Sequence, residues 1–330
     1  MATHTSRQWM VTHEWMVKPM AQAEWIEGKG LLVWLAEVFS ALGTGLYLVS
    51  LFFSTTPAYQ KSAFFAGLLG WVGIAIFKLP LHFLYLGKPW RFWRSFPPVS
   101  NAWKTSWFAR GIVFTMVFLG FGAIQLVLQG VIAYSGAAEA LSSGIWVANF
   151  VFMILAGICC VITAVYCGFA MSYCKSVPFW NTGLLPFVFL IMGIADGLAL
   201  IMGVAMVAMG VTGADTLVHT AEQVTRILLI ANAFLIIVYL VNANYQSSTG
   251  ELSVKELVRG HVAWVFWLGI VLLGIAVPFV ISIVGLFTEA SPTGLLIFAI
   301  CCHTVGAFSL KYGVLKVGIY RPILPKAHAY

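Results

Sequence analysis

The sequence predicts an all-α integral membrane protein with eight transmembrane helices. The 330-residue chain is 61% hydrophobic, only 9% of its residues are charged, and its mean hydropathy is +0.95. Soluble domains carry about 25% charged residues. Since about 20 apolar residues cross the hydrocarbon core, the polar segments divide the chain into its spans. We expect these spans at residues 31–53, 62–86, 108–134, 145–172, 182–210, 219–243, 262–287 and 293–317.

The length of the spans and their number predict the architecture. Each span is too long for a strand of a transmembrane barrel. An even number of spans places both termini on the same side of the membrane, and we expect the helices to form two four-helix bundles. Residues 1–30, rich in Trp and Met, form a segment that lies in the interface, contacts a partner or is loosely ordered. Residues 31–318 form the membrane domain, and 319–330 a C-terminal tail.

The basic residues orient the helices. Loops on the side of the termini carry most of the Lys and Arg residues, whereas the opposite loops offer little more than Lys61. The positive-inside rule therefore places the terminal side in the cytoplasm of a prokaryotic cell. This bias, with anionic lipid or an acidic partner, explains the net charge of +7 without nucleic acid.

The sequence argues against a metal centre in this protein. All six cysteines lie within or directly beside spans, without a CxxC pair, so neither an iron–sulfur cluster nor a disulfide framework is supported, and packing is their expected role. The histidines well inside spans, His82 and His303, sit at different depths, which argues against a haem. No Walker loop, dinucleotide fingerprint or HExxH motif occurs.

Ionisable residues within spans are costly and usually mark a site or a pathway. Near the terminal side, Glu37 and Lys78 have depths of ~9 and ~12 Å, compatible with an ion pair. His82 and Tyr85 share a helix face with Lys78, and Pro80 between them is expected to loosen or kink this turn.

Further ionisable residues lie toward the far side. Asp196 and Arg226 have matched depths of ~20 Å, so we expect them to pair, either as part of a proton path or to fix helix register. Glu222, one turn before Arg226, shares its charge. His303 is expected to be a hydrogen-bonded packing residue, and Lys311 to extend to the interface.

Four motifs, in order along the sequence, resemble a known family. The first is "YLGKPWRFWRSF" followed by "KTSWFARG", and the second is "VYCGFAMSYCKSVPFWNTGLLPFVFLIMGIADGLAL" at 165–200. The others are "FWLGIVLLGIAVPFV" at 266–280 and "VGAFSLKYGVLKVG" at 305–318, where Lys311 stands in place of the usual arginine. Together they resemble the NrfD/PsrC-type membrane subunit of polysulfide reductase-like complexes, from about residue 31 to 318.

The resemblance implies a quinone-reactive membrane subunit without its own redox metal. Its substrate is an exchangeable quinone, menaquinone or ubiquinone. Its partners are an iron–sulfur electron-transfer subunit and a catalytic subunit, often a molybdenum (molybdopterin) enzyme. Many relatives place the catalytic subunits outside the cytoplasm, so the side on which partners dock stays open.

The resemblance also suggests the site residues. Tyr85 occupies a position where relatives have an aspartate or a quinol-site histidine, and His82, one turn away, supplies the imidazole. Tyr166 matches the tyrosine of the family's YxG element, and Glu37 lies where the first span contributes polar site residues. Histidine exchanges protons near neutral pH, which favours His82 as proton acceptor, while Tyr166 or Tyr85 orients a quinone oxygen.

Two further sets of residues complete this interpretation. A proton relay is expected to involve Glu37, Lys78, Asp196 and Arg226. Docking of the partner is assigned to residues whose guanidinium groups bond carboxylates and stack on aromatics, namely Trp90, Arg91, Trp93 and Arg94.

Two rival functions remain open. A proton- or ion-conducting subunit would use the same buried charges as a path without a quinone site. However, a carrier acting alone is expected to show internal repeats, and we find no convincing repeat. A purely anchoring subunit would hold soluble partners without chemistry of its own.

Overall fold

The computed structural model describes residues 19–96, 99–135, 144–287 and 293–322. Within them, eight helices are long and apolar enough to cross a membrane, which confirms the predicted class. They are Gly30–Phe53 (α2), Pro57–Tyr85 (with α3, Gln60–Val72, and α4, Leu79–Tyr85), Trp107–Ser135 (α6), Gly144–Ser172 (α8), Leu185–Met209 (α9), Val211–Gln246 (α10), Val265–Phe287 (with the π-helix η4, Val265–Ala276, and α12, Val277–Phe287) and Thr293–Lys316 (α13).

The sixth span differs most from its predicted bounds. The sequence suggests 219–243, whereas α10 begins at Val211 and runs to Gln246. Gly210, with a φ of 75°, makes the turn from α9 to α10 in a single residue, because glycine adopts this left-handed backbone without a side-chain clash. The polar residues before 219 thus belong to the helix and not to a loop.

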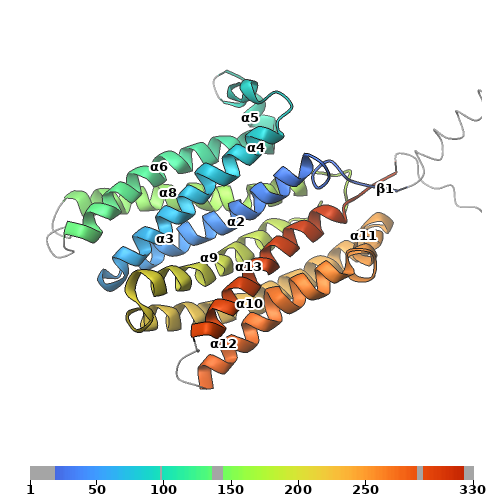
Figure 1. The fold of residues 1–330 in the computed structure, drawn as a ribbon. Coiled ribbons are helices and arrows are strands. Elements are labelled where there is room, and N and C mark those ends of the chain that lie inside the picture. The colour runs from blue at the N-terminus through green and yellow to red at the C-terminus, as the bar shows by residue number, and fades with distance from the viewer. Residues whose placement is uncertain (1–18, 97–98, 136–143, 288–292, 323–330) are drawn as a thin grey trace, which may run out of the picture.

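Helices α2 and α9 form the centre of the array (Figure 1). In their most apolar windows, 67% and 61% of residues are buried, compared with 28–39% in the other six spans. Helix α6 packs on α8, α10 on α9, and η4 on α13, and the contact between α2 and α9 joins the two halves. The division into two four-helix bundles stays a prediction.

Glycines allow α2 and α9 to approach closely. A Cβ atom on Gly45 would lie 1.7 Å from the carbonyl oxygen of Gly193, and one on Gly197 would lie 2.2 Å from Gly45. Small residues at such crossings are typical of membrane helices, where packing supplies the association energy. The backbones of the central pair are therefore in direct contact.

The second span is irregular just before the predicted site. A π-helix, Gly73–Lys78 (η2), lies directly before α4, whose second residue is Pro80. Proline cannot donate a backbone hydrogen bond, and wide π turns recur at functional sites. This agrees with the expected loosened turn, and both Lys78 and His82 are buried.

The two ends of the described structure meet. Strand β1 (Met20–Ala21) pairs antiparallel with β2 (Ile319–Tyr320). Gln22 donates a hydrogen bond to the Leu315 carbonyl, and Lys316 pairs with Glu27 at 2.5 Å. The segment 19–29, expected to lie in the interface or on a partner, thus packs on its own polypeptide. Residues 1–18 and 323–330 lie outside the described part.

Shorter elements connect the spans on the β1 side of the molecule (Figure 1). The 3-10 helix Pro89–Ser95 (η3) and α5 (Ala102–Thr105) follow α4, and α11 (Ser248–Arg259) follows α10. Ser247 caps α11 by accepting a hydrogen bond from the Gly250 amide at 3.0 Å.

Candidate functional site

Three residues predicted for the quinone site lie in mutual contact within the first half of the array. The Tyr166 hydroxyl, from α8, lies 2.9 Å from Glu37 Oε1 of α2 and 2.9 Å from His82 Nε2 of α4. Nε2 of His82 lies 3.3 Å from the same Glu37 oxygen. All three side chains are buried, and His82 is the most exposed of them at 8%.

The hydrogen bonds of this cluster indicate which of its atoms carry protons. Nδ1 of His82 lies 3.3 Å from the Lys78 carbonyl oxygen, which can only accept, so Nδ1 carries a proton. The Tyr166 hydroxyl has one proton and can donate it to Glu37 or to His82, but not to both. A second proton, on Nε2 of His82, would complete the contacts of this nitrogen with Tyr166 and Glu37. The contacts of the cluster therefore leave a place for one further proton, between His82 Nε2 and the Glu37 carboxylate.

Lys78 and Gly111 hold the Tyr166 ring. The Lys78 ammonium lies 4.4 Å from the ring centroid and 3.4 Å from the Thr115 hydroxyl, to which it donates. The ring covers Gly111 of α6, where a Cβ atom would meet Cδ2 at 2.3 Å. Lys78 thus lies at the ring and Glu37 at the hydroxyl of Tyr166, in place of the direct ion pair that the depths allowed.

Aromatic side chains gather at the end of α4, near His82. Phe83 packs edge-on against Trp90 and Phe92, both at 5.6 Å, and the ring of His82 lies 5.8 Å from Phe108. The four side chains predicted for docking, Trp90, Arg91, Trp93 and Arg94, are all exposed on η3.

Tyr85 lies apart from the cluster. It is half-buried, and its electrostatic neighbour is Glu24 of the N-terminal segment. The structure thus brings together His82, Tyr166 and Glu37, and leaves Tyr85 toward the paired ends of the polypeptide.

The expected pair of Asp196 and Arg226 is replaced by two other contacts. Asp196 Oδ1 lies 3.1 Å from Nε2 of His303, on α13. Arg226 donates two hydrogen bonds to Ser282 of α12. Nε donates to the hydroxyl at 3.2 Å, and Nη2 donates to the carbonyl oxygen at 2.9 Å. The partner of Asp196 at the same depth comes from α13 and not from α10, because α13 packs on α9 beside Asp196.

Lys311 does not reach the interface, so that expectation is wrong. It is 4% exposed, and its ammonium lies 3.3 Å from the ring centroid of Phe189 on α9. It also interacts electrostatically with Glu37 and Asp196. The aromatic face of Phe189 thus holds the Lys311 side chain inside the protein.

Sequence reasoning missed Thr115, Gly111 and the contact of His303 with Asp196, although His303 is buried and hydrogen-bonded as expected. No sequence signal marks Thr115 or Gly111 as neighbours of Tyr166. For His303, depth counted along α13 matches that of Asp196, and the sequence alone allows this comparison. Among the described residues, no group of three His, Cys, Asp or Glu side chains is arranged to hold a metal ion.

Eight apolar helices around buried polar clusters define a multi-pass integral membrane protein. The family model described as "Polysulphide reductase, NrfD" matches residues 30–322. The protein belongs to the NrfD family.

Curated relatives agree with this assignment. The C subunit of polysulfide reductase from Wolinella succinogenes is 25% identical over 243 residues, covering 71% of the present sequence and 74% of the relative. The NrfD homolog of Haemophilus influenzae is 22% identical over 254 residues, covering 73% and 77%. Protein NrfD of Escherichia coli is 29% identical over 163 residues, covering 48% and 49%.

Proposed function

We propose that this protein is the quinone-reactive membrane subunit of a respiratory oxidoreductase and exchanges electrons with an iron–sulfur subunit. The observation that carries the proposal is the buried contact of Tyr166 with both Glu37 and His82, at 2.9 Å each. A catalytic subunit completes the complex, and the family resemblance implies a molybdopterin enzyme in this role. The Wolinella relative is named as one lettered subunit of a polysulfide reductase, which supports a multi-subunit assembly.

The three clustered side chains supply the polar groups that a quinone head group needs. A quinol supplies two electrons and two protons, and its oxygens need hydrogen-bond partners inside an apolar pocket. Tyr166 orients one oxygen through its hydroxyl, and His82 Nε2 accepts a proton. Glu37, 3.3 Å from Nε2, stabilises the resulting imidazolium and takes the proton onward, with Lys78 beside it.

Access and docking favour the same end of the molecule. His82 is the most exposed member of the cluster and lies next to the aromatic side chains at the end of α4. Arg94 stacks on Trp93, with its Cζ atom 5.5 Å from the ring centroid, which holds the guanidinium at the surface. A carboxylate-bearing iron–sulfur subunit docks here, on the side that the basic bias assigns to the cytoplasm.

Tyr166→Phe is expected to weaken binding of a quinone analogue to the purified complex by roughly five- to thirtyfold. It removes one hydrogen bond, worth about 1–2 kcal/mol, and leaves the ring over Gly111 in place. Equilibrium titration with the analogue measures the change. Tyr173→Phe is the matched control, since this tyrosine is 66% exposed and contributes no bond to the cluster.

The outcomes separate the rival functions. Unchanged quinone affinity in Tyr166→Phe, with an intact complex, would favour a purely anchoring subunit. Loss of proton movement without loss of quinone binding would favour a conducting subunit. In that case the relay of Glu37, Lys78, Asp196 and Arg226 would act on its own.

Reversing the charge of the docking surface is expected to reduce assembly. Arg91→Glu combined with Arg94→Glu replaces two exposed cations that meet carboxylates of the partner. Co-purification of the iron–sulfur subunit should fall at least tenfold, whereas Lys61→Glu, in the first turn of α3 at the opposite end of the second span, should leave it unchanged. Equal recovery in all three proteins would remove η3 from the interface.

A further inference from the structure

A second titratable cluster lies in the other half of the array, outside the proposed quinone site. Asp196 of α9 and His303 of α13 are each 1% exposed, with Oδ1 and Nε2 3.1 Å apart. Neither oxygen of Asp196 receives a hydrogen bond from any residue that the structure describes. A bare carboxylate at this depth in a membrane protein is strongly disfavoured.

The backbone fixes which nitrogen of His303 carries a proton. Nδ1 lies 2.8 Å from the Gly274 carbonyl oxygen of η4. A carbonyl only accepts, so Nδ1 is the donor, and in a neutral imidazole Nε2 is left with a lone pair. This nitrogen lies 3.1 Å from Oδ1 of Asp196, and like both Asp196 oxygens it has no other hydrogen-bond partner among the described residues. Two acceptors at 3.1 Å repel each other unless one proton lies between them.

We propose that Asp196 and His303 form a buried proton-binding site in which Asp196 is a neutral carboxylic acid that donates to His303 Nε2. The neutral arrangement is favoured over an ion pair because separating charge in a low-dielectric interior costs more than the pair regains. The proton therefore belongs to the pair and not to either residue alone.

The charged groups around the pair do not replace this proton. On α13, Lys311 interacts electrostatically with Asp196, but its ammonium lies over Phe189, and Glu37 of α2 shares its charge. On α10, Arg226 bonds Ser282. Helix η4 contributes the Gly274 carbonyl, which only accepts. None of these cations forms an ion pair with Asp196 among the described contacts, so the carboxyl keeps its own proton.

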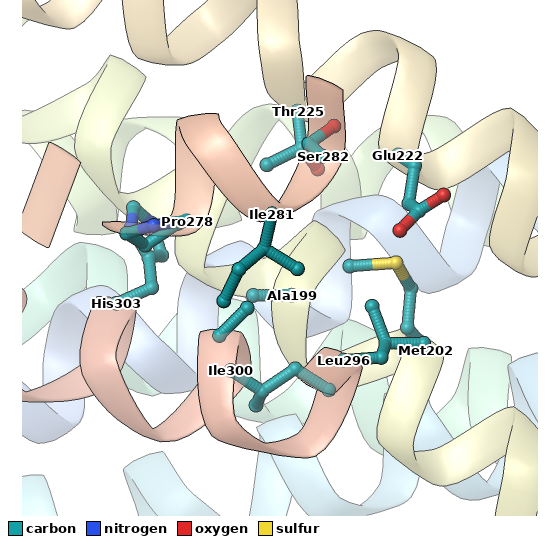
Figure 2. A pocket seen from close by; sticks show the side chains of 11 residues that line it. Ala199, Met202, Glu222, Thr225, Pro278, Ile281, Ser282, Leu296, Ile300 and His303 are labelled. Atoms are coloured by element: carbon teal, nitrogen blue, oxygen red, sulfur yellow. The ribbon is translucent and has the colours of Figure 1, made fainter. Parts of the chain in front are cut away.

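A small cavity lies between His303 and Glu222 of α10. It has a volume of about 20 Å³, enough for one water molecule, and both His303 and Glu222 line it. Figure 2 shows His303 at one side of this cavity and Glu222 at the other, with Ser282 and Thr225 nearby. These polar groups provide a route by which the proton exchanges, with Glu222 as the titratable group at its other end.

Infrared spectroscopy of the full-length protein in lipid bilayers tests the proposal without turnover or quinone. The sequence has two aspartates, Asp196 and Asp215, so isotope-labelled aspartate reports on these alone. In the Asp215→Asn variant, which leaves the pair untouched on an exposed position of α10, we expect a carboxylic-acid carbonyl band at neutral pH that shifts in heavy water. Asp196→Asn should abolish that band.

Two further results decide the assignment. His303→Ala should move the Asp196 band to the frequency of a carbonyl without a hydrogen-bonded hydroxyl. A labelled carboxylate band at neutral pH in Asp215→Asn, with no acid band, would overturn the proposal, since it would mean an ionised Asp196. Because Asp215→Asn leaves the pair intact, the test holds even where Asp196→Asn fails to fold.

Discussion

Replacing His82 with glutamine is expected to lower quinol-linked reduction of the iron–sulfur subunit by about 10²–10⁴-fold, the usual contribution of a positioned proton acceptor. Glutamine can keep a polar contact with the Tyr166 hydroxyl, now 2.9 Å from Nε2, but it cannot take up a proton. The loss should therefore fall mainly on the rate and less on quinone affinity. Steady-state kinetics of the purified complex separates the two.

The matched control for this variant is His261→Gln. His261 is a histidine on the same side of the membrane, but its side chain is 99% exposed and bonds only Glu256 among the described residues. Its replacement should leave turnover unchanged. If His82→Gln retains full activity in an assembled complex, the proton acceptor lies elsewhere and the proposed roles of Tyr166 and Glu37 fall with it.

Gly197→Val is expected to prevent assembly of the membrane domain. The new side chain would begin 2.2 Å from the Gly45 backbone, so α2 and α9 would have to separate, at a cost of about 3 kcal/mol or more. These two helices are the most buried in the array, and between them they contact α3, α4, α8, α10 and α13. Thermal unfolding in detergent and the amount of protein in the membrane measure the effect.

Gly203→Ala on the same helix provides the control. A Cβ atom there meets only Ile300 Cδ1, at 3.8 Å, an ordinary contact. We expect this variant to unfold at the wild-type temperature. Similar unfolding of both variants would mean that the close approach of α2 and α9 contributes little to stability.

The sequence was sufficient for the fold because hydrophobic length is a strong signal in membrane proteins. All eight spans were predicted. The largest error in their bounds concerned α10, whose first residues, 211–218, include polar side chains and were assigned to a loop. A one-residue turn at Gly210 carries no hydropathy signal. How the helices pack, by contrast, depends on glycines such as Gly45, which hydropathy does not distinguish from other small residues.

Prediction of the candidate site was uneven for a physical reason. Tyr166 and His82 were identified from family motifs and helix faces, and the structure places them in contact. Asp196 was assigned the wrong partner because depth alone cannot say which neighbouring helix faces it. Lys311 was placed at the interface because proximity to a helix end was taken to imply exposure, whereas Phe189 holds it inside.

The pairing of β1 with β2 has a consequence for biogenesis. Met20 and Tyr320 are partners in the same short sheet, yet at about 5–20 residues per second the ribosome makes them roughly 15 to 60 s apart. Strand β1 cannot pair until β2, which follows α13, has been synthesised. Pairing of β1 with β2 therefore requires that α13 has been made, and products truncated before residue 319 leave β1 without its partner strand.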